Sequence, residues 1–315
     1  MKAVLFGGTV PPLHAKIGEF LQTDPFARAR LEEAEEVLGT RILPKFSRTS
    51  ESYSPEARQA YLVTCIALAD RVKAEEGEAA YCAAASIGHL PALHYVGALS
   101  FEDMMRLGQR VATCENEWNS REHGTASHFM YRVDRARLAE LCALVESVGG
   151  WAEVAGHFSE EIHLLNVSAE HLPLLEREVR AQGGVSVLSF PQAEHSTANH
   201  PLRERLTMAT ATFRFTTADV GFVRGSDGAV LRSAEELRTL IQDDCVTRVD
   251  FPLVVDRLLG LGVGEVHVIG PGNLFERLTK EHFRTTVLAP DARARGLNVP
   301  EGGPARLSSA PVGSS

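Results

Sequence analysis

Ser86 follows the apolar run Tyr81-Cys82-Ala83-Ala84-Ala85, and a helix-like stretch begins soon after it at Pro91. A nucleophilic serine at a sharp strand-to-helix turn needs small residues two places before and after it, because a larger Cβ would collide with the neighbouring backbone. Ala84 and Gly88 meet this requirement, although the first glycine of the usual G-x-S-x-G pattern is absent. The pattern indicates either a nucleophile elbow or an ordinary turn serine at the end of a buried strand.

A histidine later in the chain is placed to serve as the base for such a serine. His195 comes just past a predicted strand end, within Pro191-Gln192-Ala193-Glu194-His195-Ser196. A serine at a strained turn and a histidine at a neighbouring strand end can meet at the carboxyl edge of a sheet. Ser86 and His195 are therefore a candidate nucleophile and general base.

The elements that must position these two residues carry clear start and stop signals. Asp24 as N-cap and Gly39 after the last turn predict a first helix, and Pro55 begins a second that ends near Glu76. Ser100 is the predicted N-cap of a third helix running towards Trp118. Other predicted elements are a first strand over 1–6, a turn with flanking strands over 222–230, helices from Ser233 and over 252–261, and a strand over 265–269 that closes the sheet.

The middle of the chain changes character. From Thr125 to Leu188 the predicted order is β-α-β-β-α-β, which is that of a ferredoxin-like unit. We therefore expect a large domain made of residues 1–124 and 190–288 and an inserted small domain of residues 125–189. Residues 289–315 are rich in Ala, Gly, Pro and Ser, which predicts a mobile or loosely packed tail.

Composition excludes several classes of partner and site. The 315 residues carry a formal net charge of −9, so we expect no nucleic acid partner. The apolar start of the chain is too short for a signal segment or a membrane span, which predicts a cytoplasmic protein without membrane contact. The five cysteines are widely spaced, and no C-x-x-C occurs, so we expect reduced thiols. Adjacent strands could bring His157 and His163 together, but no metal-ligand spacing accompanies them, and no metal is expected.

Several motifs in this order resemble the malonyl-CoA:acyl carrier protein transacylase family, which includes the acyltransferases of polyketide synthases. The resemblance spans roughly residues 1 to 283. The motifs that carry it are Ala84-Ala85-Ser86-Ile87-Gly88, Gly97-Ala98-Leu99-Ser100-Phe101-Glu102-Asp103, His123-Gly124-Thr125-Ala126, Gln192-Ala193-Glu194-His195-Ser196, the strand-turn around Gly225–Gly228, and Val266-His267-Val268-Ile269-Gly270-Pro271-Gly272-Asn273-Leu274.

The resemblance implies an α/β fold with an α/β-hydrolase-like large domain, an inserted ferredoxin-like small domain and a cleft between them. It also implies a two-step acyl transfer in which Ser86 becomes acylated and His195 moves the proton. The oxyanion would be held by the backbone N–H groups of Ile87 and Thr9. A main-chain carbonyl in the segment around Asp244 would orient His195.

Departures from the family pattern bear on the acyl group. The arginine that pairs with the carboxylate of malonyl units in the family falls at Val111, which predicts that malonyl and methylmalonyl groups are poor substrates. Arg106 and Arg110 should point elsewhere on the helix, although a one-turn slip in the alignment would bring Arg110 into this position. The predicted acyl pocket consists of Ala85, His89, Val111 and Glu194.

Glu194 allows two interpretations. It either faces solvent or a surface arginine, or it receives a cationic or hydroxylated acyl group, as in relatives that move aminoacyl units between carrier proteins. The leading prediction is a free-standing acyltransferase that moves a non-carboxylated acyl group, such as a starter or aminoacyl unit, to or between acyl carrier proteins in a polyketide-type pathway. The alternatives are an acyl hydrolase that clears carrier proteins and a weakly catalytic carrier-protein-binding module.

The expected substrate is the phosphopantetheine thioester of coenzyme A or of an acyl carrier protein, and no bound cofactor is expected. The expected partners are the acyl carrier protein and the acyl donor. Because carrier proteins are acidic, docking should use a local basic patch. Arg203 with Arg205 and Arg277 with Lys280 are candidates, and ordinary solvated helix faces are the alternative for each pair.

Overall fold

A computed structural model describes residues 1–8, 14–46, 54–121, 123–271 and 274–290. The side chains of residues 14–16 are not described. The chain forms two compact units. The first contains Met1–Ser120, His200–Cys245 and the described residues from Asp250 onwards; the second contains Arg121–Asn199 and Val246–Val249. Predicted tail residues from 291 onwards lie outside the described part of the chain.

The first unit is built on a six-stranded sheet in which neighbouring strands are parallel except for the last pair. In spatial order its strands are β11 (Arg284–Leu288), β10 (Glu265–Ile269), β1 (Lys2–Phe6), β2 (Tyr81–Ala84), β7 (Gly221–Val223) and β8 (Val230–Leu231). Strand β1 is buried from Ala3 to Phe6, as expected of a parallel strand covered on both faces. The sheet does not close at β10 as predicted, because β11 adds a parallel edge strand beyond it.

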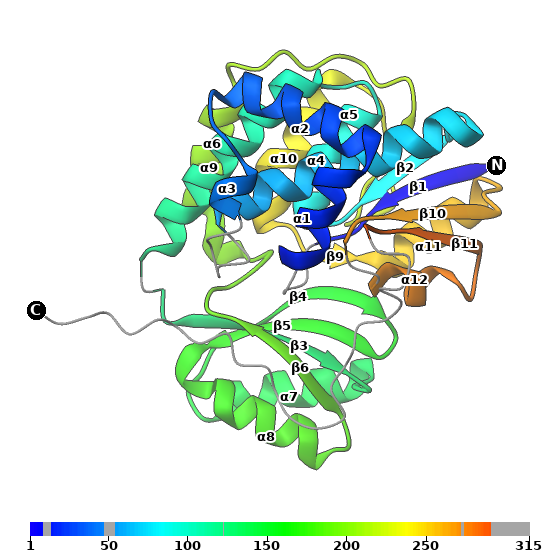
Figure 1. The fold of residues 1–315 in the computed structure, drawn as a ribbon. Coiled ribbons are helices and arrows are strands. Elements are labelled where there is room, and N and C mark those ends of the chain that lie inside the picture. The colour runs from blue at the N-terminus through cyan, green and yellow to red at the C-terminus, as the bar shows by residue number, and fades with distance from the viewer. Residues whose placement is uncertain (9–13, 47–53, 122, 272–273, 291–315) are drawn as a thin grey trace, which may run out of the picture. The chain divides into compact units, whose positions relative to one another are not determined.

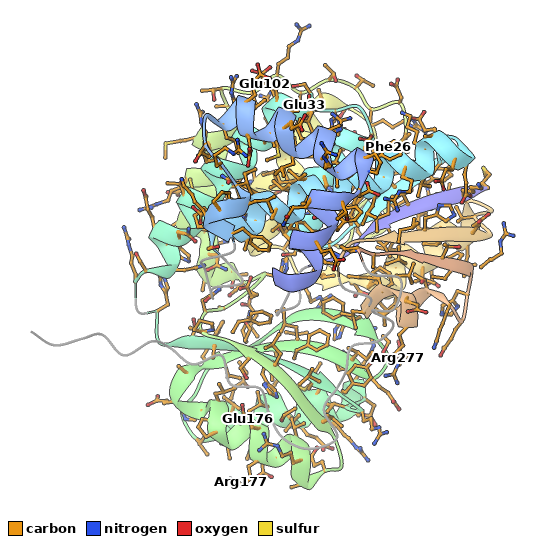
Figure 2. The ribbon with its side chains drawn as sticks, in the orientation of Figure 1. Phe26, Glu33, Glu102, Glu176, Arg177 and Arg277 are labelled. Carbon is orange, nitrogen blue, oxygen red and sulfur yellow. The ribbon has the colours of Figure 1, made fainter. Side chains whose placement is uncertain are left out.

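Helices surround this sheet (Figure 1). They are α1 (His14–Thr23), α2 (Pro25–Leu38), α3 (Leu43–Phe46), α4 (Pro55–Glu76), α5 (His89–Tyr95), α6 (Phe101–Asn119), α9 (His200–Thr210), α10 (Ala234–Asp243), α11 (Phe251–Gly260) and α12 (Leu274–Thr279). Charged side chains such as Glu33 and Glu102 project from their outer faces (Figure 2). No helix in the described residues is long and apolar enough to cross a membrane.

The predicted helix caps are present. The Asp24 carboxylate accepts the Ala27 N–H at 3.0 Å, and α2 ends at Gly39, whose φ is 62°. The Ser100 hydroxyl accepts the Asp103 N–H at 3.0 Å at the start of α6. At the start of α4 the Ser54 hydroxyl, which was not predicted as a cap, accepts the Ala57 N–H. Capping is a local interaction, so these helix boundaries could be predicted without knowledge of the tertiary structure. Helices α1 and α3 were not predicted.

The second unit has the predicted β-α-β-β-α-β order. Its elements are β3 (Thr125–Tyr131), α7 (Arg135–Ser147), β4 (Ala152–Ser159), β5 (Ile162–Ser168), α8 (Leu172–Ala181) and β6 (Val185–Phe190). The sheet order is β6-β3-β5-β4, extended at the β4 edge by β9 (Val249–Asp250). Helices α7 and α8 lie along one face (Figure 1) and share an apolar core with Met130, Leu165 and Val167.

The second unit continues ten residues beyond the expected boundary at 189, as far as Asn199. The reason is a set of side-chain hydrogen bonds from its strands to the segment after β6. The Thr125 hydroxyl accepts the Ala193 N–H at 3.1 Å, and the Asn166 amide donates to the Glu194 carbonyl at 2.8 Å. His195 therefore belongs to the second unit, whereas Ser86 belongs to the first.

Candidate active site

Ser86 lies at a strained turn between β2 and α5. Its φ is 52°, in the left-handed region that costs a non-glycine residue energy. One turn of 3-10 helix, Ser86–Gly88, connects it to α5. A Cβ added at Gly88 would lie 2.6 Å from the Phe6 carbonyl oxygen of β1, so only glycine fits two places after the serine. A left-handed residue between a strand and a helix, followed two places later by an obligatory glycine, has the backbone geometry that a nucleophile elbow requires.

Of the two backbone groups expected to hold an oxyanion, one lies in the described part of the chain. Ile87, which follows the elbow serine, lies in the 3-10 turn and is half-buried. Thr9 lies outside the described residues. Gly7, two residues before Thr9, is held by two hydrogen bonds. Its carbonyl accepts the buried Tyr61 hydroxyl, and its N–H donates to the Ile269 carbonyl at 3.1 Å. Tyr61 of α4 and Ile269 of β10 thus fix the chain just after β1. This role of Tyr61 was not predicted from the sequence.

His195 is the second residue of the candidate pair, and its backbone is also left-handed, with φ of 47°. It follows β6 in the second unit and is 8% exposed. Both candidate residues thus combine a strained backbone with partial or full burial. Such strain persists only where surrounding contacts over-determine it, and it clusters at functional sites.

His89 and Asp244 form a close pair within the first unit. Nδ1 of His89, at the start of α5, lies 3.0 Å from Oδ1 of Asp244. The histidine side chain is 7% exposed and the aspartate side chain 25%. Neither ring nitrogen of His89 makes a hydrogen bond to the residues that the structure describes, so the contact with Asp244 is within ion-pair distance without hydrogen-bond geometry. From the sequence we assigned His89 to the acyl pocket and Asp244 to the segment that orients His195. Their contact with each other was not predicted.

No family profile matches the chain. The malonyl CoA-acyl carrier protein transacylase of Bacillus subtilis (strain 168) is 22% identical over 284 residues, which cover 89% of each protein. An acyl-carrier-protein S-malonyltransferase from Burkholderia pseudomallei 1710b has the same fold, with a TM-score of 0.81 at 18% identity over 93% of this chain and 97% of that one. The fold is that of the malonyl-CoA:acyl carrier protein transacylases.

A further solved structure agrees with this result. It is a malonyl-transacylase in complex with a type II polyketide synthase acyl-carrier protein, with a TM-score of 0.81 at 19% identity over 93% of this chain and 97% of that one. The mixed α/β fold class and the resemblance to the transacylase family, both predicted from the sequence, are confirmed.

Val111, the position at which the resemblance led us to expect the carboxylate-binding arginine of the family, has apolar surroundings. Val111 lies in α6, is 5% exposed and belongs to the core of the first unit. Neighbouring arginines have partners of their own. Arg106 pairs with Glu102 at 2.7 Å on the exposed side of α6, and Arg110 bonds Thr212 and stacks over Phe213 with 5.0 Å between its guanidinium carbon and the ring centroid.

Glu194 and Ala85 are the remaining residues of the predicted acyl pocket. Ala85 is 6% exposed, immediately before the elbow serine. Glu194 is half-buried, and its carboxylate accepts a hydrogen bond from the Gln192 side chain at 2.8 Å. Its backbone N–H and carbonyl are both bonded to Asn166.

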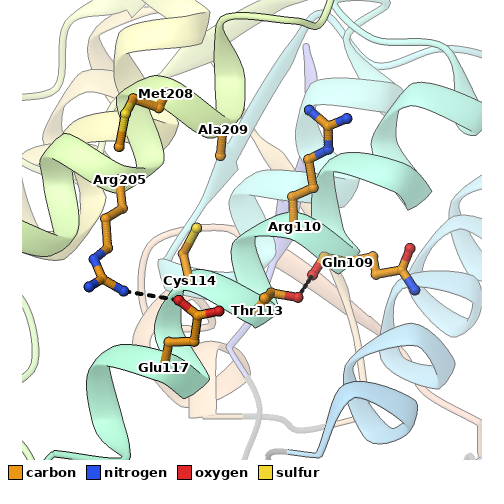
Figure 3. A pocket seen from close by; sticks show the side chains of 8 residues that line it. All are labelled: Gln109, Arg110, Thr113, Cys114, Glu117, Arg205, Met208 and Ala209. Carbon is orange, nitrogen blue, oxygen red and sulfur yellow. Dashed lines mark hydrogen bonds and ion pairs between the residues drawn. The ribbon is translucent and has the colours of Figure 1, made fainter.

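A shallow hollow lies between α6 and α9, apart from the elbow (Figure 3). Arg205 crosses it to pair with Glu117 at 3.1 Å. Its neighbour on α9, Arg203, pairs with Asp243 of α10. Both arginines predicted as a docking rim thus carry a carboxylate partner within the first unit, which favours the interpretation as ordinary helix surface.

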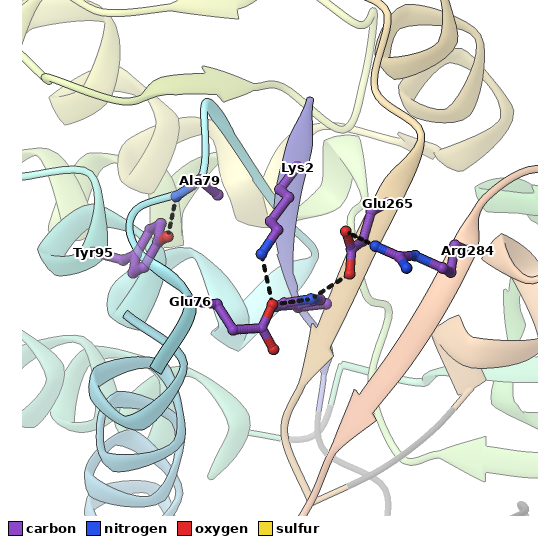
Figure 4. A network of polar contacts seen from close by, with 7 residues as sticks. Lys2, Glu76, Ala79, Tyr95, Glu265 and Arg284 are labelled. Carbon is purple, nitrogen blue, oxygen red and sulfur yellow. Dashed lines mark hydrogen bonds and ion pairs between the residues drawn. The ribbon is translucent and has the colours of Figure 1, made fainter. Parts of the chain in front are cut away.

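Two clusters contain metal-ligand types of residue. In the second unit, Nδ1 atoms of His157 and His163 lie 3.0 Å apart, so β4 and β5 bring the two histidines together as anticipated. In the first unit, donor atoms of Glu76, Glu265 and His267 lie within 4.8 Å of one another. Lys2 and Arg284 neutralise these two carboxylates (Figure 4), so this second cluster is an ion-pair network.

Proposed function

We propose that this protein is an acyltransferase that moves a non-carboxylated acyl group to or between acyl carrier proteins through an acyl-enzyme on Ser86. The observation that carries the proposal is the left-handed elbow at Ser86 in a chain with the transacylase fold. A serine at a strained strand-to-helix turn projects its hydroxyl for attack. The substrate would be the phosphopantetheine thioester of coenzyme A or of a carrier protein.

In the first step, Ser86 Oγ attacks the thioester carbonyl carbon while the His195 imidazole takes the hydroxyl proton. The tetrahedral intermediate collapses, the carbon–sulfur bond breaks, and the imidazolium returns the proton to the departing thiol. In the second step, the imidazole takes a proton from the thiol of the acceptor carrier protein, and the resulting thiolate attacks the serine ester. Ser86 Oγ leaves and regains its proton from His195.

The negative charge of each tetrahedral intermediate needs hydrogen-bond donors. We assign this role to the backbone N–H groups of Ile87 and Thr9, since donors aimed at developing charge in a water-poor site supply much of the rate enhancement of acyl transfer. A main-chain carbonyl near Asp244 would orient the imidazole. These roles follow the family pattern read from the sequence.

The apolar surroundings of Val111 support a non-carboxylated acyl group. A carboxylate buried without a cationic partner costs roughly 3–5 kcal/mol, which is on the order of a hundredfold or more in affinity. If Glu194 receives a cationic acyl group, Glu194→Gln will lower turnover of amino-bearing donors more than that of neutral donors. Equal turnover of the two donor types would remove that role for Glu194.

Intact-mass spectrometry of the wild-type protein and Ser86→Ala tests the proposal. After incubation with a panel of acyl-CoA and acyl-carrier-protein donors, we expect a covalent adduct on the wild type only. Ser168→Ala, which changes a serine of the second unit, should still form it. Rapid loss of the adduct on addition of carrier protein indicates transfer, and equal loss without it indicates hydrolysis. The absence of an adduct with every donor would contradict the acyltransferase and favour a binding module.

A further inference from the structure

The peptide before His195 is held by two buried side chains of the second unit. Asn166 of β5 bonds both backbone groups of Glu194: its amide donates to the carbonyl at 2.8 Å and its oxygen accepts the N–H at 3.1 Å. The Ser127 hydroxyl of β3 accepts the same N–H at 2.8 Å and lies 2.8 Å from the Gln192 carbonyl. Asn166 and Ser127 are both fully buried.

The residues after His195 are held by a third strand. The Glu153 carboxylate of β4 accepts the Thr197 N–H at 3.2 Å and the Thr197 hydroxyl at 2.8 Å, and its other oxygen accepts the Ser196 hydroxyl. Hydrogen bonds to a charged acceptor are about twice as strong as neutral ones. The chain is therefore bonded to the sheet on both sides of His195.

His195 itself carries the strain between these two attachments. A non-glycine residue in the left-handed region is strained and relaxes unless its neighbours prevent it. The bonds from Asn166, Ser127 and Glu153 fix the chain on both sides of this residue, whose φ is 47°, and so oppose that relaxation. Backbone φ determines where the imidazole points, because the Cα–Cβ bond turns with it.

We propose that Asn166, Ser127 and Glu153 are positioning residues that hold His195 in its left-handed conformation and so aim the imidazole for proton transfer. This inference rests on the proposed function, since it concerns the base of that reaction. Three neighbouring strands each contribute one residue. A misplacement of about 1 Å in a reacting group can lower a rate by about a hundredfold.

Asn166→Asp is the sharpest test, because it keeps the shape and the accepting oxygen but places a carboxylate oxygen against the Glu194 carbonyl. Single-turnover mass spectrometry gives the rate constant of Ser86 acylation, which does not depend on the folded fraction. We expect this constant to fall by about ten- to a hundredfold, with the donor concentration for half-maximal rate unchanged. Ser127→Ala should lower it in the same way.

Ser168→Ala is the matched control, since this β5 serine accepts one hydrogen bond from the Trp151 N–H at 2.9 Å but does not bond residues 192–197. It should lower the melting temperature without changing the rate constant. Rate constants of Asn166→Asp and Ser127→Ala equal to that of the wild type would overturn the inference. A wild type that never forms the adduct would instead overturn the proposed function. In that case a crystal structure of Asn166→Asp tests the positioning role separately. The φ angle of His195 should become negative in this variant, and an unchanged φ angle would contradict the positioning role.

Discussion

Nδ1 of His89 lies 3.0 Å from a carboxylate oxygen of Asp244, which joins the first turn of α5 to the segment after α10. His89 comes three residues after the elbow serine, so the pair ties the helix that begins at the elbow to a segment 155 positions further along the chain. Replacing Asp244 by asparagine would remove the carboxylate charge that faces the buried His89 ring.

Asp244→Asn should therefore lower the free energy of unfolding by about 1–3 kcal/mol, because charges shielded from solvent interact more strongly than exposed ones. The neighbouring Asp243 offers a matched control, because its ion pair with Arg203 is between half-exposed side chains and is worth less than about 1 kcal/mol. Urea unfolding of Asp244→Asn and Asp243→Asn measures both changes. Equal effects would show that the His89 contact contributes no more than a surface ion pair.

Gly88→Ala should disrupt the elbow. The added Cβ would lie 2.6 Å from the Phe6 carbonyl oxygen, a contact that the backbone of β1 or of the elbow must relieve by moving. We expect a loss of about 1–3 kcal/mol in stability and no detectable Ser86 adduct. Gly18→Ala in α1 is the control, because its Cβ meets no atom within 4 Å among the described residues, and it should stabilise the protein slightly. Thermal unfolding and intact mass measure the two effects; a normal adduct in Gly88→Ala would contradict the elbow.

The His157–His163 pair should make stability depend on pH. The pKa of each imidazole is lowered to about 4, mainly by burial. Arg135 contributes to both shifts, His157 to that of His163 and Arg248 to that of His157, while Glu160 acts in the opposite direction. The unfolded chain, with pKa values near 6.5, thus binds protons between about pH 6.5 and 4 that the folded chain does not. The free energy of unfolding therefore falls as the pH falls through this window.

His157→Asn should reduce this pH dependence by about 1–2 kcal/mol between pH 7 and pH 5. Urea unfolding at a series of pH values measures it. A profile of His157→Asn that coincides with the wild type would show that the pair does not titrate in this window.

Val111 should make acylation of Ser86 slower with carboxylated donors than with uncarboxylated ones. In single-turnover acylation, the wild type should react with acetyl-CoA about a hundredfold faster than with malonyl-CoA, since Val111 offers no partner for a carboxylate. Val111→Arg should lower the ratio of the acetyl-CoA rate constant to the malonyl-CoA rate constant, and Val111→Leu should leave this ratio unchanged. Because both are ratios of rate constants on the same protein, partial unfolding of Val111→Arg does not alter them. A wild type that accepts malonyl as readily as acetyl would contradict the proposal.

Much of the fold could be predicted because its signals are local. Asp24 and Ser100 cap α2 and α6 as expected, and the β-α-β-β-α-β order of the second unit is present in the sequence pattern. The small residues around Ser86 anticipated a strained turn, whose left-handed backbone the structure contains. The edge strand β11 and the short helix α3 were missed, since neither carries a cap or a long apolar pattern of its own.

The sequence by itself determined which residues can do chemistry and the order of the elements that carry them. Only the tertiary structure decided which side chains meet: His89 with Asp244, and Asn166, Ser127 and Glu153 with the segment around His195. The contacts around His195 depend on strand order and register, which bring residues many positions apart to neighbouring places on a sheet, whereas His89 meets Asp244 because α5 packs against α10. Such long-range pairing leaves no periodicity or cap in the sequence around either partner, so no local signal could have predicted it.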